Sequence, residues 1–310
     1  MKPSLQGYAA AVLGSVTGPA ALTVASELEA VHELVDGTPQ LRAALTDTTM
    51  TSATRRGVVG DLLDGRVSTA ARRAAVFAAG AVSAPDVPAG LAWLAHRARR
   101  QAEGAIDGEP ALGYLSARER VAGYATAVLE ELPTADLEAI EDELFRFTRT
   151  VESAGQLRAA LANRELPVAV RTAVVAELMS GKAHAATTAL IGYAIEGGRS
   201  RDLVGTLDYL VEHVAKARGW RVARVHAARE VDASERDELS RALSALAGTP
   251  VELQVSIEPE LLSGVLVSIG DLQVDSTTRG RLDALHEHLF NDSWANLLDA
   301  PQGTDDKGAR

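Results

Sequence analysis

The sequence contains no cysteine among its 310 residues. Disulfide bonds, thiolate metal sites and cysteine nucleophiles are therefore excluded. Aromatic residues are also scarce, at 4% of the chain, whereas hydrophobic residues make up 46%. The hydrophobic cores must consequently consist mainly of alanine, leucine and valine. Alanine and leucine are strong helix formers, so this composition predicts closely packed helices.

Positive charge is in deficit, and long apolar runs are missing. There are 31 Lys and Arg residues against 42 Asp and Glu residues, which gives a net charge of -11. An acidic surface argues against nucleic acid or anionic lipid as the main partner, because both require a basic face. No stretch approaches the roughly 18 consecutive apolar residues that a membrane span needs. We therefore expect a soluble protein.

The chain contains an internal repeat. Residues Gln40–Leu45 read QLRAAL, and the same letters recur at Gln156–Leu161, a shift of 116 positions. The same shift relates further pairs: Tyr8 with Tyr124, Glu27-Leu28 with Glu143-Leu144, Arg55 with Arg171, Val58-Val59 with Val174-Val175, Gly65 with Gly181 and Phe77 with Tyr193. A register kept without gaps over this length predicts two domains of the same fold. The N-terminal residues belong to the repeat, so we expect them in a domain core and not in a cleaved signal peptide.

Each copy has the pattern of a small helical bundle. Apolar residues recur at helical spacing, as in Leu22, Ala25, Leu28, Val31 and Val35. Glycine and proline divide each copy into about six short helices joined by short connections. We place the first bundle at residues 1–100 and the second at 118–218, with a Gly-, Glu- and Pro-containing linker at 101–117.

The C-terminal part reads as a small α/β domain over residues 219–290, followed by a tail at 291–310 that we expect to be disordered. The alternating residues Val251, Leu253, Val255 and Ile257 predict a strand with one buried face. The expected order of elements is a strand at 220–225, a helix opened by Asp232 and Glu235, the strand at 251–257, a hairpin at 265–274 and a helix carrying Leu282, Leu285 and Leu289.

One stretch carries a family resemblance. Its landmarks, in order, are Pro259, Leu261, Ser263-Gly264, an alternating strand, Ile269-Gly270-Asp271, Val274-Asp275 and Arg279-Gly280-Arg281-Leu282. This order and spacing resemble the C-terminal signature of the delta subunit of F-type ATP synthases, which is called the oligomycin-sensitivity-conferring protein in mitochondria. The second copy and the C-terminal part, from Val121 to about Leu289, match the usual layout of the family. The extra first copy resembles the arrangement in actinobacterial ATP synthases.

The resemblance implies a mainly α fold, with two tandem six-helix bundles followed by a small α/β C-terminal domain. It implies a non-catalytic stator subunit that joins the catalytic head to the peripheral stalk, without an active site, cofactor or metal. The expected partners are the N-terminal segments of the ATP synthase alpha subunit and a b-type peripheral stalk subunit. The expected location is peripheral, on the cytoplasmic face of the cell membrane, with membrane association only through the complex. The residues that carry the structural signature are Gly264, Gly270, Asp271, Asp275, Arg279, Gly280 and Leu282.

Several polar clusters are candidate sites. His286 and His288 point about 200° apart on a helix, which disfavours a shared metal ion. The acidic pairs Glu130-Glu131 and Glu141–Glu143 lie on helical segments, and a solvated helix face is a better interpretation than acid/base catalysis. Arg279 and Arg281 beside the two aspartates of the signature either brace the junction of hairpin and helix or contact a partner. A cytosolic helical-repeat scaffold for another assembly is the alternative function.

Overall fold

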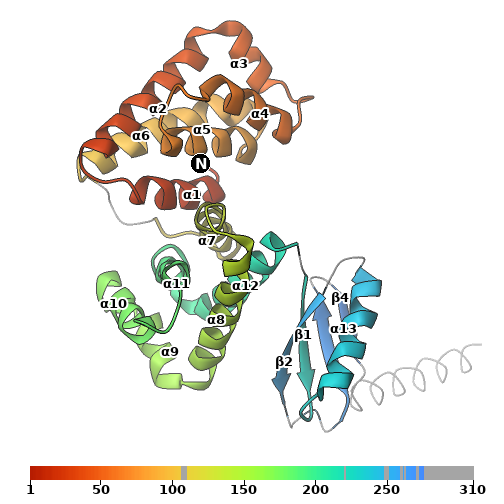
Figure 1. The fold of residues 1–310 in the computed structure, drawn as a ribbon. Helices are drawn as coiled ribbons and strands as arrows, with labels where there is room; N and C mark the ends of the chain where they lie inside the picture. The colour runs from red at the N-terminus through yellow and green to blue at the C-terminus, as the bar shows by residue number, and fades with distance from the viewer. Residues whose placement is uncertain are drawn as a thin grey trace, which may run out of the picture. The chain divides into compact units, whose positions relative to one another are not determined.

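A computed structural model of the chain describes residues 1–105, 110–219, 221–247, 251–258, 261, 263–269 and 272–275. The chain divides into two compact units, Met1–Arg218 and Gly219–Arg310, which are described separately. The predicted mainly helical fold with a small α/β region near the C-terminus is confirmed (Figure 1). The limits that we predict for the individual bundles, the linker and the tail stay predictions.

The first unit contains two sets of helices. The first helix set comprises α1 (Pro3–Gly14), α2 (Pro19–Gly37), α3 (Pro39–Thr46), α4 (Ser52–Leu63), α5 (Thr69–Ala81), the 3-10 helix η1 (Ala84–Asp86) and α6 (Val87–Ala102). The second helix set comprises α7 (Tyr114–Leu129), α8 (Thr134–Ser153), α9 (Gly155–Ala162), α10 (Val168–Met179), α11 (Ala185–Gly197), the 3-10 helix η2 (Ser200–Asp202) and α12 (Leu203–Ala217). Moved by 116 positions, the bounds of α3, α4, α5 and η1 coincide with those of α9, α10, α11 and η2.

Local sequence explains where these helices begin. Proline occupies one of the first two positions of α1, α2, α3 and α6, where its missing N–H and fixed φ suit a helix start. The Thr51 hydroxyl accepts the Thr54 N–H at 3.1 Å at the start of α4, and the Ser68 hydroxyl accepts the Ala71 N–H at 3.3 Å at the start of α5. Gly65 and Gly181, which the repeat relates, follow α4 and α10 at φ of 64° and 66°, a region that favours glycine.

Each helix set has its own hydrophobic core. The first contains the fully buried Leu5, Leu28, Leu45, Leu91 and Leu94, and the second contains Ile140, Leu144, Leu161, Leu190 and Ile191. Helix α5 turns an alanine face to the core, made of Ala71, Ala74, Ala75, Ala78 and Ala79. Such small side chains let helices approach closely. The predicted alanine- and leucine-built cores are confirmed.

The second unit is a four-stranded sheet with one described helix. It comprises β1 (Arg221–Ala227), α13 (Ala233–Ala247), β2 (Val251–Ile257), β3 (Val265–Ile269) and β4 (Leu272–Asp275). The strand order is β2-β1-β3-β4, with β1 and β2 parallel and the other neighbours antiparallel. Leu243 of α13 packs with Ala223, Val225, Val251 and Val267 of the strands. The capping box is confirmed, because the Glu235 N–H donates to Asp232 Oδ1 at 2.9 Å and the Asp232 N–H donates to Glu235 Oε2 at 3.2 Å.

Candidate functional site

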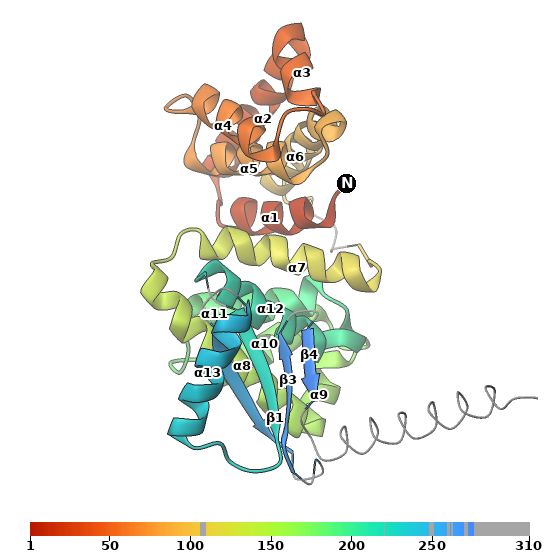
Figure 2. The same cartoon turned by 90° about the vertical axis from the view of Figure 1, so that its right-hand side faces the viewer.

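The two helix sets meet along a seam, which we define as the contact between α1 and α7. These first helices of the two sets lie side by side (Figure 2). A Cβ atom on Gly7 would overlap the carbonyl oxygen of Arg120, and a Cβ atom on Gly123 would overlap that of Ser4. Only glycine permits this backbone approach. The shift of 116 relates Gly7 to Gly123 and Ser4 to Arg120, so the seam is reciprocal, like the interface of a symmetric dimer.

Polar contacts cross the seam on one side. The Tyr8 hydroxyl of the first set donates to Glu130 Oε2 of the second at 2.7 Å. The Arg73 guanidinium lies 3.5 Å from the Glu130 carboxylate, forms an ion pair with Glu131 and donates to the Ala127 carbonyl at 2.6 Å. Burial, followed by the hydrogen bond to Glu130, raises the pKa of Tyr8 above its usual value. The interpretation of Glu130-Glu131 as a solvated pair agrees with their side-chain exposures of 46% and 64%, but the sequence did not show that both carboxylates also join the two helix sets.

Stacked aromatic rings mark equivalent positions on the two sides of the seam. The Tyr8 and Phe77 rings stack with centroids 3.8 Å apart, and the Tyr124 and Tyr193 rings stack at 3.9 Å. Each ring pair lines an open pocket. We call them the Tyr8 pocket, about 700 Å³, and the Tyr124 pocket, about 730 Å³. Each pocket is composite. The Tyr8 pocket combines α1, α4 and α5 of the first set with Glu130 at the end of α7, and the Tyr124 pocket combines α7, α10 and α11 of the second set with α1 and α6 of the first.

The two pockets differ in chemistry although their frames match. The Tyr8 pocket carries Arg56, Arg72, Arg73, Asp61, Asp64 and Glu130. Most of these charges are absent from the Tyr124 pocket, which is lined by Ala10, Ala11, Gly14, Ala189 and Gly192 together with Thr172, Arg97 and Glu196. The repeat relates Arg56 to Thr172 and Arg73 to Ala189. The Tyr124 pocket is therefore lined by smaller side chains and by fewer charged ones.

The other acidic cluster is structural as well. Glu141 is buried, with a relative exposure of 2%, and its Oε2 accepts a hydrogen bond from Arg218 Nη1 at 2.6 Å. Glu143 accepts the His184 N–H at 2.9 Å, as Glu27 of the first set accepts the Ser68 N–H at 3.0 Å. The interpretation of Glu141–Glu143 as a solvated face is wrong for these two residues. Glu27 and Glu143 thus play the same structural part, and the recurrence of Glu27-Leu28 at Glu143-Leu144 was the sequence signal for it.

The signature of the C-terminal unit is only partly described. Gly264 lies directly before β3 at a φ of 89°, which is a turn conformation that favours glycine. Asp275 is the last residue of β4 and pairs with Leu266 of β3. The remaining signature residues, Gly270, Asp271, Arg279, Gly280 and Leu282, lie outside the described residues, as do His286 and His288. The functional importance of the signature stays a prediction.

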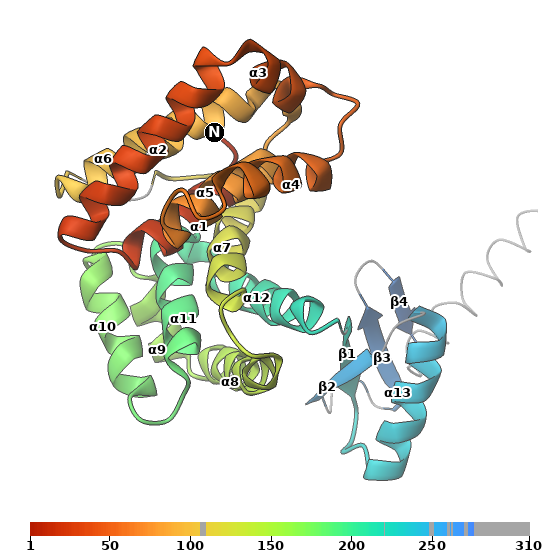
Figure 3. The ribbon, with the colours of Figure 1, turned by 45° about the horizontal axis from the view of Figure 1, so that its top comes forward.

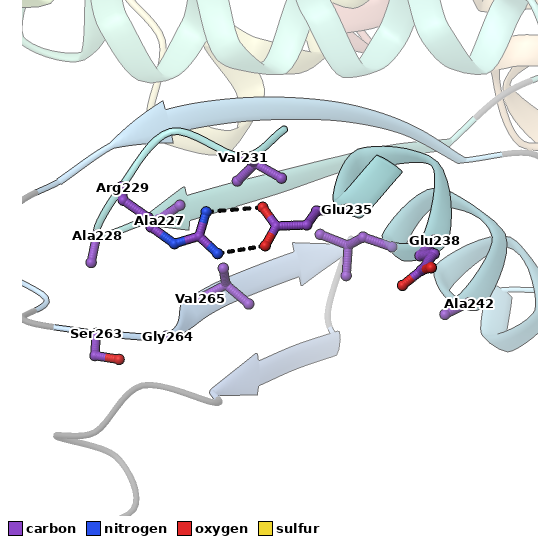
Figure 4. Close-up of a pocket in the computed structure, with 11 residues that line it drawn as sticks. Ala227, Ala228, Arg229, Val231, Glu235, Glu238, Ala242, Ser263, Gly264 and Val265 are labelled. Carbon is purple, nitrogen blue, oxygen red and sulfur yellow. Dashed lines mark hydrogen bonds and ion pairs between the residues drawn. The ribbon is translucent and has the colours of Figure 1, made fainter. Parts of the chain in front are cut away.

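A pocket of about 690 Å³ opens between α13 and the ends of β1 and β3 (Figure 4). We call it the Leu239 pocket, and its apolar lining includes Val231, Leu239, Ala242 and Val265. Arg229 crosses its edge with a two-pronged ion pair to Glu235, in which one hydrogen bond measures 2.9 Å. This hydrogen bonding lowers the pKa of the Glu235 carboxyl below its usual value.

The described part of the chain holds no group of three His, Cys, Asp or Glu side chains arranged to bind a metal ion. None of its helices combines the length and the apolar character that crossing a membrane requires.

The seam joins the two helix sets through backbone and polar contacts, which is a structural role. Known proteins specify the class further. The sequence model of the family "ATP synthase delta (OSCP) subunit" matches residues 121–289. The ATP synthase subunit delta of Parafrankia sp. is 33% identical over 289 residues, which cover 92% of this chain and 94% of the relative. That of Kineococcus radiotolerans is 33% identical over 89% of this chain and 90% of the relative, and that of Nocardia farcinica 31% over 92% and 96%.

The chain belongs to the ATP synthase delta (OSCP) family, and the resemblance found in its C-terminal residues is confirmed. It is thus a structural stator subunit of ATP synthase and not a catalytic one, and a peripheral part of that membrane-bound complex. A chain in the mitochondrial ATP synthase hexamer of Toxoplasma gondii has a TM-score of 0.41 and 19% identity, and covers 60% of this chain and 98% of that one. That similarity is too weak to support any argument about the fold.

Proposed function

We propose that this chain connects the catalytic head of ATP synthase to a b-type peripheral stalk subunit and resists the torque of the rotor, on the cytoplasmic face of the cell membrane. The observation that carries the proposal is the near full-length similarity to delta subunits, which includes both helix sets and the α/β unit. Rotary catalysis requires a head that is held still, so a stator component must bind firmly at two ends. The division of the chain into two compact units supports two such ends.

In this proposal the first unit binds the catalytic head. We assign the N-terminal segments of the alpha subunits to the Tyr124 pocket, as amphipathic helices laid into a groove. Helices α1 and α7 pack against each other in the seam, and the Tyr124 pocket opens beside them. The small residues Gly14, Ala189 and Gly192 leave the Tyr124 pocket open to a closely approaching helix. The stacked Tyr124 and Tyr193 rings supply an apolar wall.

In this proposal the α/β unit binds the peripheral stalk. The Leu239 pocket combines apolar side chains with the exposed ion pair between Arg229 and Glu235 at its edge. An apolar centre with a polar rim is the usual composition of a protein interface. We assign the end of the b-type stalk helices to this pocket.

A chain truncated after Arg218 tests the two-ended connection. The first unit has its own cores, so circular dichroism of the truncated chain should still show strong helix. Membranes carrying it should lose proton-driven ATP synthesis, because torque resistance needs an unbroken path from head to membrane. The detached head should continue to hydrolyse ATP. Normal ATP synthesis in these membranes would contradict the proposal.

Cross-linking tests the assignment of the head contact. The chain has no cysteine, so a single introduced cysteine can be labelled without background. A photo-cross-linker on Thr172→Cys should capture an alpha-subunit N-terminal segment in the purified complex. The matched control is Arg56→Cys, the equivalent position in the Tyr8 pocket. Capture from position 56 but not from position 172 would move the head contact to the Tyr8 pocket.

A further inference from the structure

A third surface of the first unit has the composition of a docking site. It is a groove of about 260 Å³ between α8, α9 and α10 of the second helix set, which lie next to one another in Figure 3. We call it the Phe147 groove. Its apolar lining contains Phe147, Leu157, Leu178 and Met179, and Leu178 is 43% exposed. Contiguous exposed apolar side chains, unlike single scattered ones, are the feature that marks interaction sites.

The apolar face continues along α10 beyond the groove. Val170, Val174 and Leu178 follow at intervals of four residues and so lie on one side of the helix. Val170 is 47% exposed and Leu178 43%. The groove and this row of side chains form one elongated apolar surface, whose length suits a helix better than a small molecule.

Basic side chains border this surface. Arg146 and Lys182 line the Phe147 groove and are both exposed. Arg146 pairs with Asp142 one helical turn away, at an exposed site where such a pair contributes little. The acidic member of the lining, Glu143, is engaged by the His184 N–H and the Thr187 hydroxyl. On a chain of net charge -11, the groove therefore presents a basic border around an apolar floor.

The first helix set provides an internal comparison, because it has the same helices with only part of this surface chemistry. At the positions equivalent to Arg146 and Thr150 it has Ala30 and Leu34. At the position equivalent to Val170 it has Thr54, whereas Lys182 corresponds to the basic Arg66. Arg146 and the Val170 end of the apolar row are thus not needed for the fold, since the same fold forms without them. Their presence in one set points to a role in binding.

We propose that the Phe147 groove docks an amphipathic helix of another subunit of the complex, with apolar anchors at i, i+3, i+4 and i+7 and acidic residues beside them. The apolar floor would receive the anchors, and Arg146 and Lys182 would pair with the acidic residues. A second copy of this chain is a poor occupant, because two chains of charge -11 repel each other. The contact goes beyond the proposed head and stalk contacts, since it uses neither the seam pockets nor the α/β unit.

The test uses the purified ATP synthase complex with a photo-cross-linker on Leu178→Cys. We expect capture of an acidic amphipathic segment of another subunit, identified by mass spectrometry. Adding the charge reversals Arg146→Glu and Lys182→Glu should lower the yield about tenfold, because both border charges then repel the acidic helix. The matched control adds Ala30→Glu and Arg66→Glu at the equivalent exposed positions of the first set and should leave the yield unchanged.

Circular dichroism and thermal melting should show that all variants keep the fold, because the substituted residues are exposed. Capture of a second copy of this chain, capture of a segment without acidic residues, or no capture would each overturn the proposal. A yield that falls equally in the control would also overturn it, since the effect would then follow net charge and not the groove. The test is separate from that of the proposed function, which depends on ATP synthesis and on capture at position 172.

Discussion

The two helix sets share a frame and differ in their polar surfaces. Core leucines, the ring stack, the turn glycines Gly65 and Gly181 and the seam glycines Gly7 and Gly123 recur at a shift of 116. Most charges of the Tyr8 pocket, Arg146 of the Phe147 groove and the seam carboxylates do not recur, whereas Lys182 of the groove corresponds to Arg66. The residues that specify the backbone are thus repeated, whereas the residues available to partners have diverged. The second set is the more neutral at its seam pocket and the more basic at its outer groove.

The largest effect is expected at the seam. Gly7→Ala would push a Cβ atom into the Arg120 carbonyl, which belongs to a backbone that cannot move aside. We expect a loss of about 3 kcal/mol in the free energy of unfolding, at the upper end of overpacking costs, or a separation of the two helix sets. Chemical denaturation and small-angle X-ray scattering of the full chain measure the two results.

The control for this variant is Gly57→Ala on α4, where an added Cβ atom meets nothing within 4 Å. The equivalent residue of the second set is Ala173. A helical glycine replaced by alanine at an open position should gain up to about 1 kcal/mol. Equal behaviour of the two variants would show that the seam is not a close backbone contact.

A smaller difference in stability cost is expected between substitutions of two buried arginines that the repeat relates, Arg55 and Arg171. Arg55 donates to three carbonyl groups, those of Ala79 at 2.9 Å, Met50 at 2.7 Å and Val82 at 3.3 Å. Arg171 donates to the Leu161 carbonyl at 3.1 Å, while its Nε has no hydrogen-bond partner among the described residues. We expect Arg55→Met to cost about 3 kcal/mol and Arg171→Met about 1 kcal/mol, because unpaired carbonyls are costly. Urea denaturation measures both, and equal costs would remove this difference between the sets.

The hydrogen bond across the seam should contribute less. Tyr8→Phe removes the bond to Glu130 but keeps the stacked ring, so we expect a loss of about 1 kcal/mol. The position equivalent to Glu130 in the first set is Gly14, which offers Tyr124 no carboxylate. Tyr124→Phe should accordingly cost only a few tenths of 1 kcal/mol. Thermal denaturation of the two variants at neutral pH measures both losses of stability. A larger loss for Tyr124→Phe than for Tyr8→Phe would contradict the prediction.

The smallest expected effect is acid sensitivity of the second set. Burial, and then the charge of Lys216, lowers the pKa of His213 below the ordinary value of 6.5. A lowered pKa in the folded state means that the unfolded chain binds the proton more readily. The stabilisation is therefore present above the ordinary value and is lost as the pH falls below it. The equivalent residue of the first set is Arg97, which does not titrate in this range.

His213→Gln should remove part of the loss in melting temperature between about pH 7.5 and about pH 5.5. The His213 Nε2 atom lies 3.0 Å from the Thr126 hydroxyl, and glutamine keeps a polar group there. An unchanged pH dependence in the variant would show that other groups account for the acid sensitivity.

The sequence predicted the repeat, the helical frame and the strand pattern, since each depends on regular spacing along the chain. It did not predict the seam. The recurrence of Gly7 at Gly123 was a visible signal. However, a glycine inside a helical pattern does not indicate which other helix packs against it. The seam contact of Glu130 and the burial of Glu141 were missed for a similar reason. Their partners Tyr8 and Arg218 lie 122 and 77 residues away in the sequence.

The sequence by itself determined the family, the mainly α fold and the equivalence of the two helix sets, because order, spacing and apolar periodicity are properties of the chain. The tertiary structure decided that the sets pair through α1 and α7, that each seam pocket needs both sets, and that Arg146 and Lys182 border an apolar groove at the outer face of the second set. These features depend on distances between residues far apart in the chain. Hydrophobic burial and backbone contact fix those distances only after the helices have packed.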